Sequence, residues 1–171
     1  MGDDVIVLWE KEVFEKVMKG NEQEDFYQEY NKQREIGFDA YQNQVKNEIK
    51  SIETSEELHF LITDYNYDAG EFLLEEVVSH PFCDIKTAKM IYWLSEPIYL
   101  YEKFGTLENC TQDDYLNYAG VKLLMKIEEK AKSKSFKEML KVRQDIDVKE
   151  MIEETDFTIE PYIHIPKELR K

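Results

Sequence analysis

The sequence predicts an all-α protein, built as a compact array of short helices. Apolar residues recur at helical spacing, helix-start signals separate them, and only 6 glycines and 4 prolines occur among 171 residues. A chain of this length can bury about two thirds of its unfolded surface without a disulfide or a metal. We therefore expect one helical domain over residues 1–171, with helical pairs arranged as in a short solenoid.

The central element is predicted between Asp84 and Pro97. Asp84 is a helix-capping residue, and Pro97 disfavours helix just before it while favouring a new helix start. Apolar residues cover most of the intervening helix and leave mainly Lys86, Thr87 and Lys89 for solvent or for an unusual role. Such a helix must be surrounded by other helices, so we expect it to form the centre of the core.

Further helices are predicted before this element. Residues 4–19 carry apolar residues at helical spacing, although the apolar run near their start also fits a buried strand. Residues 38–52 show a clean helical stripe, and Thr54 with Glu57 forms a capping box that begins the next helix. Asp68 then predicts the start of another helix.

Helical spacing continues after Pro97 as far as Gly105. Thr111 and Asp114 form a second capping box, which predicts a long helix with Leu116 in its buried stripe.

Two more capping boxes follow, Ser135 with Glu138 and Asp147 with Glu150, and each predicts a short helix. Residues 157–171 combine β-branched and aromatic residues with two prolines. This composition predicts a C-terminal extended arm laid over the helices, or at most an edge strand.

The formal net charge of −15 is unevenly distributed. Residues 55–110 hold 11 acids and 3 bases, whereas residues 111–171 hold 13 acids and 12 bases. An acidic surface repels nucleic acid and steers a basic protein towards it. Acidity that only keeps the protein soluble is the alternative interpretation.

The sequence also bears on location. Cys83 and Cys110 are its only cysteines, and neither a zinc spacing nor a targeting segment is present. No apolar run is long enough to span a membrane. We expect a reduced, cytoplasmic protein with no membrane partner and no cofactor.

Two blocks of residues carry a resemblance to a known family. Residues 65–70 read Tyr-Asn-Tyr-Asp-Ala-Gly, and residues 80–84 read His-Pro-Phe-Cys-Asp, with Thr87 and Ala88 following at the helix start. These blocks resemble the bacterial domain-of-unknown-function family 4274, which shows Tyr-Asn-Trp-Asp-Asp-Gly and His-Pro-x-Cys-Asp-x-Gly-Thr-Ala.

The chain departs from the family pattern at Tyr67, Ala69 and Lys86, and the lost acid at position 69 weakens any charged site there. The resemblance covers about residues 55–105. It implies a family-like helical core and a bacterial origin, and it implies no activity.

The polar residues of the two blocks fit structural roles at helix ends, where short side chains satisfy open backbone groups. Two turn residues, two helix caps and their neighbours make up this structural motif: Asn66, Asp68, Gly70, His80, Cys83, Asp84 and Thr87.

Two chemical alternatives centre on the turn from His80 to Asp84. Imidazole, thiolate and carboxylate are zinc ligands, and His59, Cys110 or His164 are the residues available to complete a site. Alternatively, Cys83 near a helix start and His80 is a candidate nucleophile of an enzyme. No oxyanion donor or base-orienting partner accompanies it, and Asp84 disfavours a thiolate beside it. We therefore predict no catalytic residues and no metal site.

The favoured hypothesis is a non-enzymatic protein-binding protein. Tyrosine gives contact area at low entropic cost, and carboxylates select a basic partner. A specific form is an immunity-type protein, which neutralises a basic bacterial toxin through an acidic face. The candidate residues of that face are Tyr67, Glu71, Glu75, Glu76, Tyr99 and Glu102.

Overall fold

The computed structural model describes residues 35–63, 65, 70–141 and 164–170. Within these ranges the fold is all-α, with six α-helices and no strand, and the predicted fold class is confirmed. The predictions for residues 4–19, for a helix start at Asp68 and for a helix after Asp147 lie outside the described residues. So does most of the predicted C-terminal arm.

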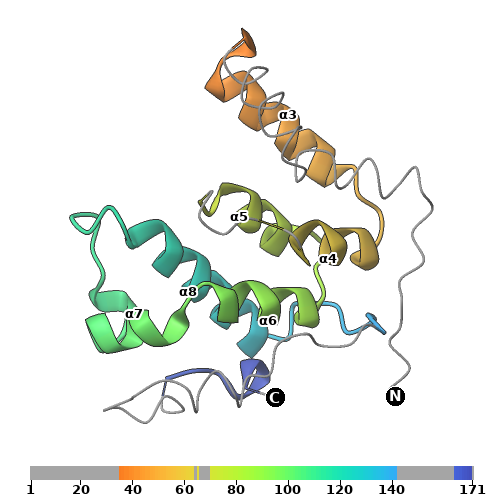
Figure 1. Cartoon of the computed structure of the whole chain (residues 1–171). Helices are drawn as coiled ribbons and strands as arrows, with labels where there is room; N and C mark the ends of the chain where they lie inside the picture. The colour runs from red at the N-terminus through yellow and green to blue at the C-terminus, as the bar shows by residue number, and fades with distance from the viewer. Residues whose placement is uncertain (1–34, 64, 66–69, 142–163, 171) are drawn as a thin grey trace.

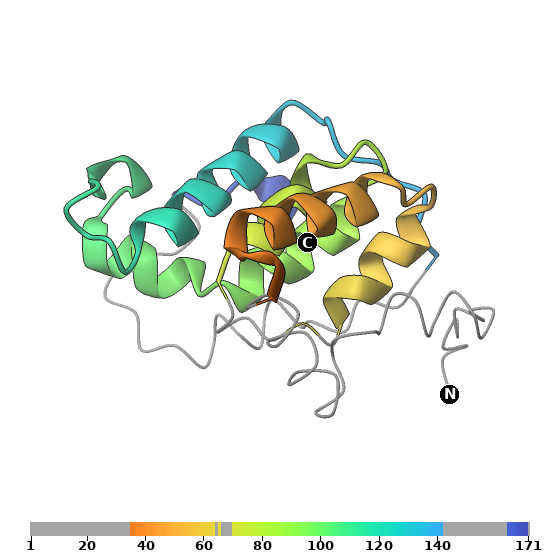
Figure 2. The ribbon, with the colours of Figure 1, turned by 90° about the horizontal axis from the view of Figure 1, so that it is seen from above.

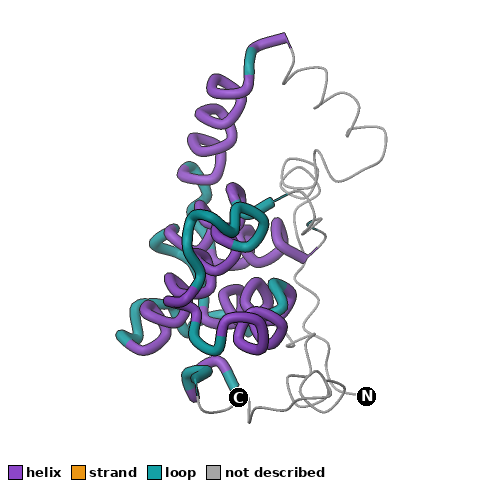
Figure 3. The backbone as a smooth tube through the Cα atoms, turned by 90° about the vertical axis from the view of Figure 1, so that its left-hand side faces the viewer, coloured by secondary structure: helices purple, strands orange, loops and turns teal. Residues whose placement is uncertain are grey.

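The helices lie in successive layers. Figure 1 shows α3 uppermost, α4 and α5 below it, and then α6 and α8, while Figure 3 shows the same stack from the side. α3 packs against α5, α4 packs against α6, and both α5 and α6 pack against α8. Seen from above in Figure 2, α7 and the loop that follows it form one end of the molecule. The elements are α3 (Phe38–Lys50), α4 (Ser55–Thr63), α5 (Phe72–Ser79), α6 (Ile85–Leu94), α7 (Pro97–Phe104) and α8 (Tyr118–Lys132), with the 3-10 turns η2 (Leu107–Asn109) and η3 (Lys167–Leu169).

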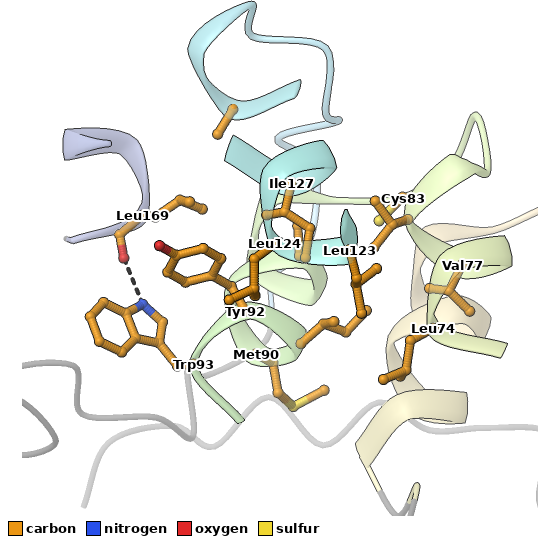
Figure 4. Close-up of a cluster of buried hydrophobic side chains, with 14 of the residues drawn as sticks. Leu74, Val77, Cys83, Met90, Tyr92, Trp93, Leu123, Leu124, Ile127 and Leu169 are labelled. Atoms are coloured by element: carbon orange, nitrogen blue, oxygen red, sulfur yellow. Dashed lines mark hydrogen bonds between the residues drawn. The ribbon is translucent and has the colours of Figure 1, made fainter. Parts of the chain in front are cut away.

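Helix α6 is the centre of the core, as predicted. The side chains of α6 and α8 meet in Figure 4, and Trp93 donates a hydrogen bond from Nε1 to the carbonyl of Leu169 at 2.7 Å. The C-terminal turn η3 is thereby attached to the central helix. No helix in the described ranges is both long and apolar enough to cross a membrane.

The burial of α6 is more complete than its sequence indicates. Thr87 and Lys89 were expected to face solvent, but both are buried, because α4, α7 and α8 all pack around this helix. Leu94, the last residue of the helix, is exposed although it is apolar. The solvent-facing strip predicted for α6 is therefore wrong at these positions.

Two predicted helix boundaries are confirmed. The hydroxyl of Thr54 accepts a hydrogen bond from the backbone N–H of Glu57 at 3.2 Å, as the capping box predicts. Helix α7 begins at Pro97 and ends at Phe104, just before Gly105, whose positive φ of 74° suits a residue without a side chain.

The capping box at Thr111 does not begin a helix. Helix α8 starts at Tyr118, and the residues before it form turns. The carboxylate of Asp114 instead bonds to Lys103 at 2.9 Å and to the side chain of Asn117 at 2.8 Å. Leu116 is consequently 75 % exposed, which corrects its predicted place in a buried stripe.

The predicted helix after Ser135 is also wrong. Residues 136–140 run past the start of α6 as a non-helical segment. The N–H of Lys137 donates to the carbonyl of Cys83 at 3.0 Å, and the N–H of Ile85 donates to the carbonyl of Lys137 at 2.9 Å. These bonds compete with the local helix that Ser135 and Glu138 would otherwise favour.

The different environments of two leucines give a first prediction. Leu124→Ala on α8 should lower the free energy of unfolding by about 2–5 kcal/mol, because Leu124 is buried in the core. Leu116→Ala should change it by less than about 0.5 kcal/mol, because that side chain is exposed. Urea unfolding of both variants measures the difference. A loss of similar size in both would place Leu116 in the core and contradict the late start of α8.

Candidate functional site

The turn from His80 to Asp84 links three parts of the fold. His80 follows the last residue of α5, its carbonyl accepts from the N–H of Cys83 at 3.0 Å, and its Nδ1 accepts from the N–H of Phe82 at 3.1 Å. The hydroxyl of Ser55 donates to the carbonyl of Phe82 at 2.6 Å, which ties the turn to the start of α4. Burial lowers the pKa of His80, so its neutral form is favoured.

Asp84 caps α6 as predicted and also holds a distant segment. Its Oδ1 accepts from the N–H of Lys86 at 2.9 Å. Its Oδ2 accepts from the N–H groups of Met139 at 2.7 Å and Leu140 at 3.0 Å. The side chain is only 1 % exposed, and these three donors compensate a buried carboxylate.

The other residues of the two family-like blocks take local roles where they are described. Gly70 adopts a positive φ of 97°, and its carbonyl accepts from the hydroxyl of Tyr65 at 2.7 Å. Thr87, one turn into α6, pairs through its hydroxyl with Nδ1 of buried His59 at 3.0 Å. Asn66, Asp68 and the candidate binding residue Tyr67 lie outside the described residues.

The buried turn offers little support for thiolate chemistry. Burial raises the pKa of the Cys83 thiol to about 12, with Lys130 opposing this effect and Asp84 adding to it. A nucleophile or zinc ligand needs a thiolate, and a thiol with so high a pKa remains protonated at neutral pH. His, Cys, Asp and Glu side chains of the described part of the chain form no group of three that could hold a metal ion.

A buried carboxylate at Glu128 was not singled out by the sequence. Its Oε1 accepts from the hydroxyls of Tyr92 at 2.8 Å and Tyr101 at 2.6 Å, so α6, α7 and α8 meet at one oxygen. The Tyr101 ring stacks on His164 at 5.3 Å, which extends the cluster to the C-terminal segment. Burial raises the pKa of Glu128 despite these hydrogen bonds. Its place beside Ile127 in the α8 stripe is the signal that could have identified it.

Three predicted binding residues lie at α5. Glu75 forms an ion pair with Lys126 at 3.4 Å, and Glu76 forms one with Lys46 at 3.2 Å. Glu71 is half-buried just before the helix. Neighbouring lysines therefore offset part of the negative charge on this helix.

The other two described candidates lie on α7, at the end of the molecule seen in Figure 2. Tyr99 is 49 % exposed and Glu102 is exposed as well. The structure thus places five of the six candidate residues in two groups, one at α5 and one on α7, and the sixth, Tyr67, lies outside the described residues.

The fold and the buried turn define a compact helical domain organised around a capped central helix. Residues 53–132 match the model of a family described as a domain of unknown function (DUF4274), as the two residue blocks predicted. The match begins just before α4 and ends with α8, so it is longer than the block resemblance indicated. Neither a curated protein nor a solved structure matched the chain.

The double role of Asp84 gives a second prediction. Asp84→Ala should lower the free energy of unfolding by about 2–4 kcal/mol, because it removes a cap and leaves the N–H groups of Met139 and Leu140 without a carboxylate. Thr54→Ala is the matched control, since it removes one exposed cap and should cost about 1 kcal/mol. Chemical denaturation compares them. Equal losses of unfolding free energy in the two variants would show that the hydrogen bonds from Asp84 to Met139 and Leu140 do not stabilise the fold.

The raised pKa of Glu128 predicts a pH dependence. A carboxyl group whose folded pKa exceeds its unfolded value stabilises the fold below the unfolded pKa, and this contribution is lost as pH rises through the folded pKa. Relative to Glu128→Gln, the wild type should therefore lose stability as pH rises from about 4 to 7. Unfolding free energies measured across this range test it.

Exposed Glu129→Gln is the matched control for the neighbouring position on the same helix. It should change stability little at any pH in the range. A Glu128→Gln variant that followed the wild type in parallel at every pH would contradict the raised pKa.

Proposed function

We propose that the protein is a non-enzymatic binding protein that holds a basic protein partner through its acidic, tyrosine-bearing surface. The specific form proposed is an immunity-type protein, which covers the cationic site of a bacterial toxin. The observation that carries the proposal is the excess of acids over bases in residues 55–110, 11 against 3.

The placement of two of the three bases supports this argument. Lys89 is buried, and Lys103 is paired with Asp114, so neither presents a free positive charge to a partner. Asp84 is buried and Glu75 and Glu76 pair with lysines, but Glu56, Glu96, Glu102 and Glu108 of this segment are exposed, so an acidic excess remains at the surface. Such a surface accelerates association with a cationic protein, and it does so most at low ionic strength.

The exposed tyrosine on α7 is a candidate anchor for binding affinity, which charge alone does not provide. Affinity in protein interfaces depends on a few anchors, among which tyrosine is enriched, while rim charges mainly set the association rate. Tyr99 is half-exposed, and Glu102 is exposed three positions further along the same helix. Residues separated by three positions lie on one face of a helix, so an anchor and a charge are presented together.

This function predicts a salt-dependent association rate. A basic protein captured from the native host should bind faster at low salt, with a steep fall as the Debye length shortens to about 10 Å. Glu102→Lys should slow association at low salt and reduce the salt dependence, because it reverses a charge on the proposed surface.

Glu138→Lys is the matched control, since it makes the same charge change on the exposed segment beside α6. It should have a clearly smaller effect than Glu102→Lys. Association rates that do not vary with salt, or equal effects of the two variants, would contradict binding through the acidic surface. Stopped-flow or surface-based kinetics at several salt concentrations provide the measurement.

A further inference from the structure

Exposed apolar side chains gather at the end of the molecule formed by α7 and the loop before α8. Tyr115 is 81 % exposed and Leu116 is 75 % exposed in the loop, and Tyr99 is 49 % exposed on α7. We define Tyr99, Tyr115 and Leu116 as the α7–α8 patch. Large side chains exposed together in this way indicate an interaction surface, whereas scattered ones do not.

An ion pair brings the two halves of the patch to the same end. Lys103 of α7 contacts Asp114 of the loop at 2.9 Å, and Asp114 directly precedes Tyr115. The hydrogen bond to Asp114 and, to a smaller degree, the Tyr99 phenol raise the pKa of Lys103. The ammonium group of Lys103 therefore links α7 to the loop.

Hydrogen bonds within the loop hold it in one conformation. Asp114 accepts from the side chain of Asn117 at 2.8 Å, and its own N–H donates to the carbonyl of Thr111 at 3.0 Å. Its carbonyl accepts from the N–H of Tyr118, the first residue of α8, at 3.0 Å. A surface that is already ordered loses little conformational freedom on binding, which favours affinity.

The charge around the patch selects its occupant. Glu102, Glu108 and Asp113 are exposed, and none forms an ion pair with another described residue. The single base in residues 97–117 is Lys103, which Asp114 neutralises. The apolar patch thus has an acidic rim and fits a partner with an apolar centre and a cationic periphery.

The acidic rim argues that neither another segment of this chain nor a second copy of it covers the patch. Residues 1–34 contain nine acids and five bases, and residues 142–163 contain seven acids and two bases. A second copy carries a net charge of −15. Like charges across an interface are destabilising, so an acidic segment or a second copy is a poor occupant.

We infer that the α7–α8 patch is the docking site for a lysine- or arginine-rich segment of another protein, with Tyr115 and Leu116 as its apolar anchors. This inference rests on the proposed binding function and locates its centre at α7 and the loop before α8. The α5 carboxylates are secondary, because Lys126 and Lys46 already pair with two of them.

The test uses the full chain as bait for a library of random peptides displayed on phage. Enriched peptides should be cationic and contain apolar residues, and their affinity should fall at least about tenfold for the double variant Tyr115→Ser and Leu116→Ser. Both side chains are exposed, so this variant should fold normally. Met139→Ser is the matched control, since it removes an exposed apolar side chain beside α6 and should leave affinity unchanged.

The other outcomes separate the docking site from the proposed function. Cationic peptides whose affinity survives the double variant but falls in Glu75→Gln with Glu76→Gln would overturn the patch and leave the basic-partner function standing. Enriched peptides that are neutral or acidic, or a library that gives no binder to the wild type, would overturn both. A wild type that sediments as a dimer beside a monomeric double variant would show that a second copy covers the patch, which also overturns the inference.

Discussion

The carboxylate of Asp84 is the interaction on which the arrangement of the core depends. One oxygen caps the first turn of α6, and the other takes two backbone N–H groups from residues 139–140. A carboxylate removed from water is tolerated only when its oxygens are satisfied, so the start of α6 and the path of the distant segment are fixed together. The helices that surround α6 then pack against an element whose first turn cannot shift independently.

This interaction also connects the family domain to the chain that follows it. The family match ends at residue 132, whereas the segment held by Asp84 lies just beyond that boundary. Trp93 makes a second connection of this kind, through its hydrogen bond to Leu169. The central helix therefore organises more of the chain than the family domain alone.

Three capping boxes show how far the sequence could predict the fold. The box at Thr54 begins a helix because its hydroxyl meets a free N–H and an apolar stripe follows immediately. At Thr111 and Ser135 the same residue types occur, but Asp114 is engaged by Lys103, and residues 136–140 are engaged by the start of α6. The signature is local, and it fails where a partner distant in sequence binds the same groups more favourably.

The candidate binding surface could also be predicted only in part, because local spacing does not reveal contacts between residues distant in sequence. Tyr99 and Glu102 could be found, because helical spacing separates Tyr99 from the buried face of α7. Tyr115 and Leu116 could not, since an early helix start would have buried Leu116 in the apolar stripe of α8. Glu128 could not be identified either, because a glutamate on a long helix is usually exposed, whereas this one is buried.

These positions divide the carboxylates of the protein into two kinds with different physical consequences. Asp84 and Glu128 are buried and hydrogen-bonded, so they organise the core and add little to the field outside it. Glu102, Glu108 and Asp113 are exposed, and the field of exposed charges reaches about a Debye length into solution before salt screens it. Total charge counts both kinds equally, whereas an approaching partner responds chiefly to the second. An acidic composition becomes a binding property here because exposed acids surround exposed apolar side chains on a loop that the fold already holds in place.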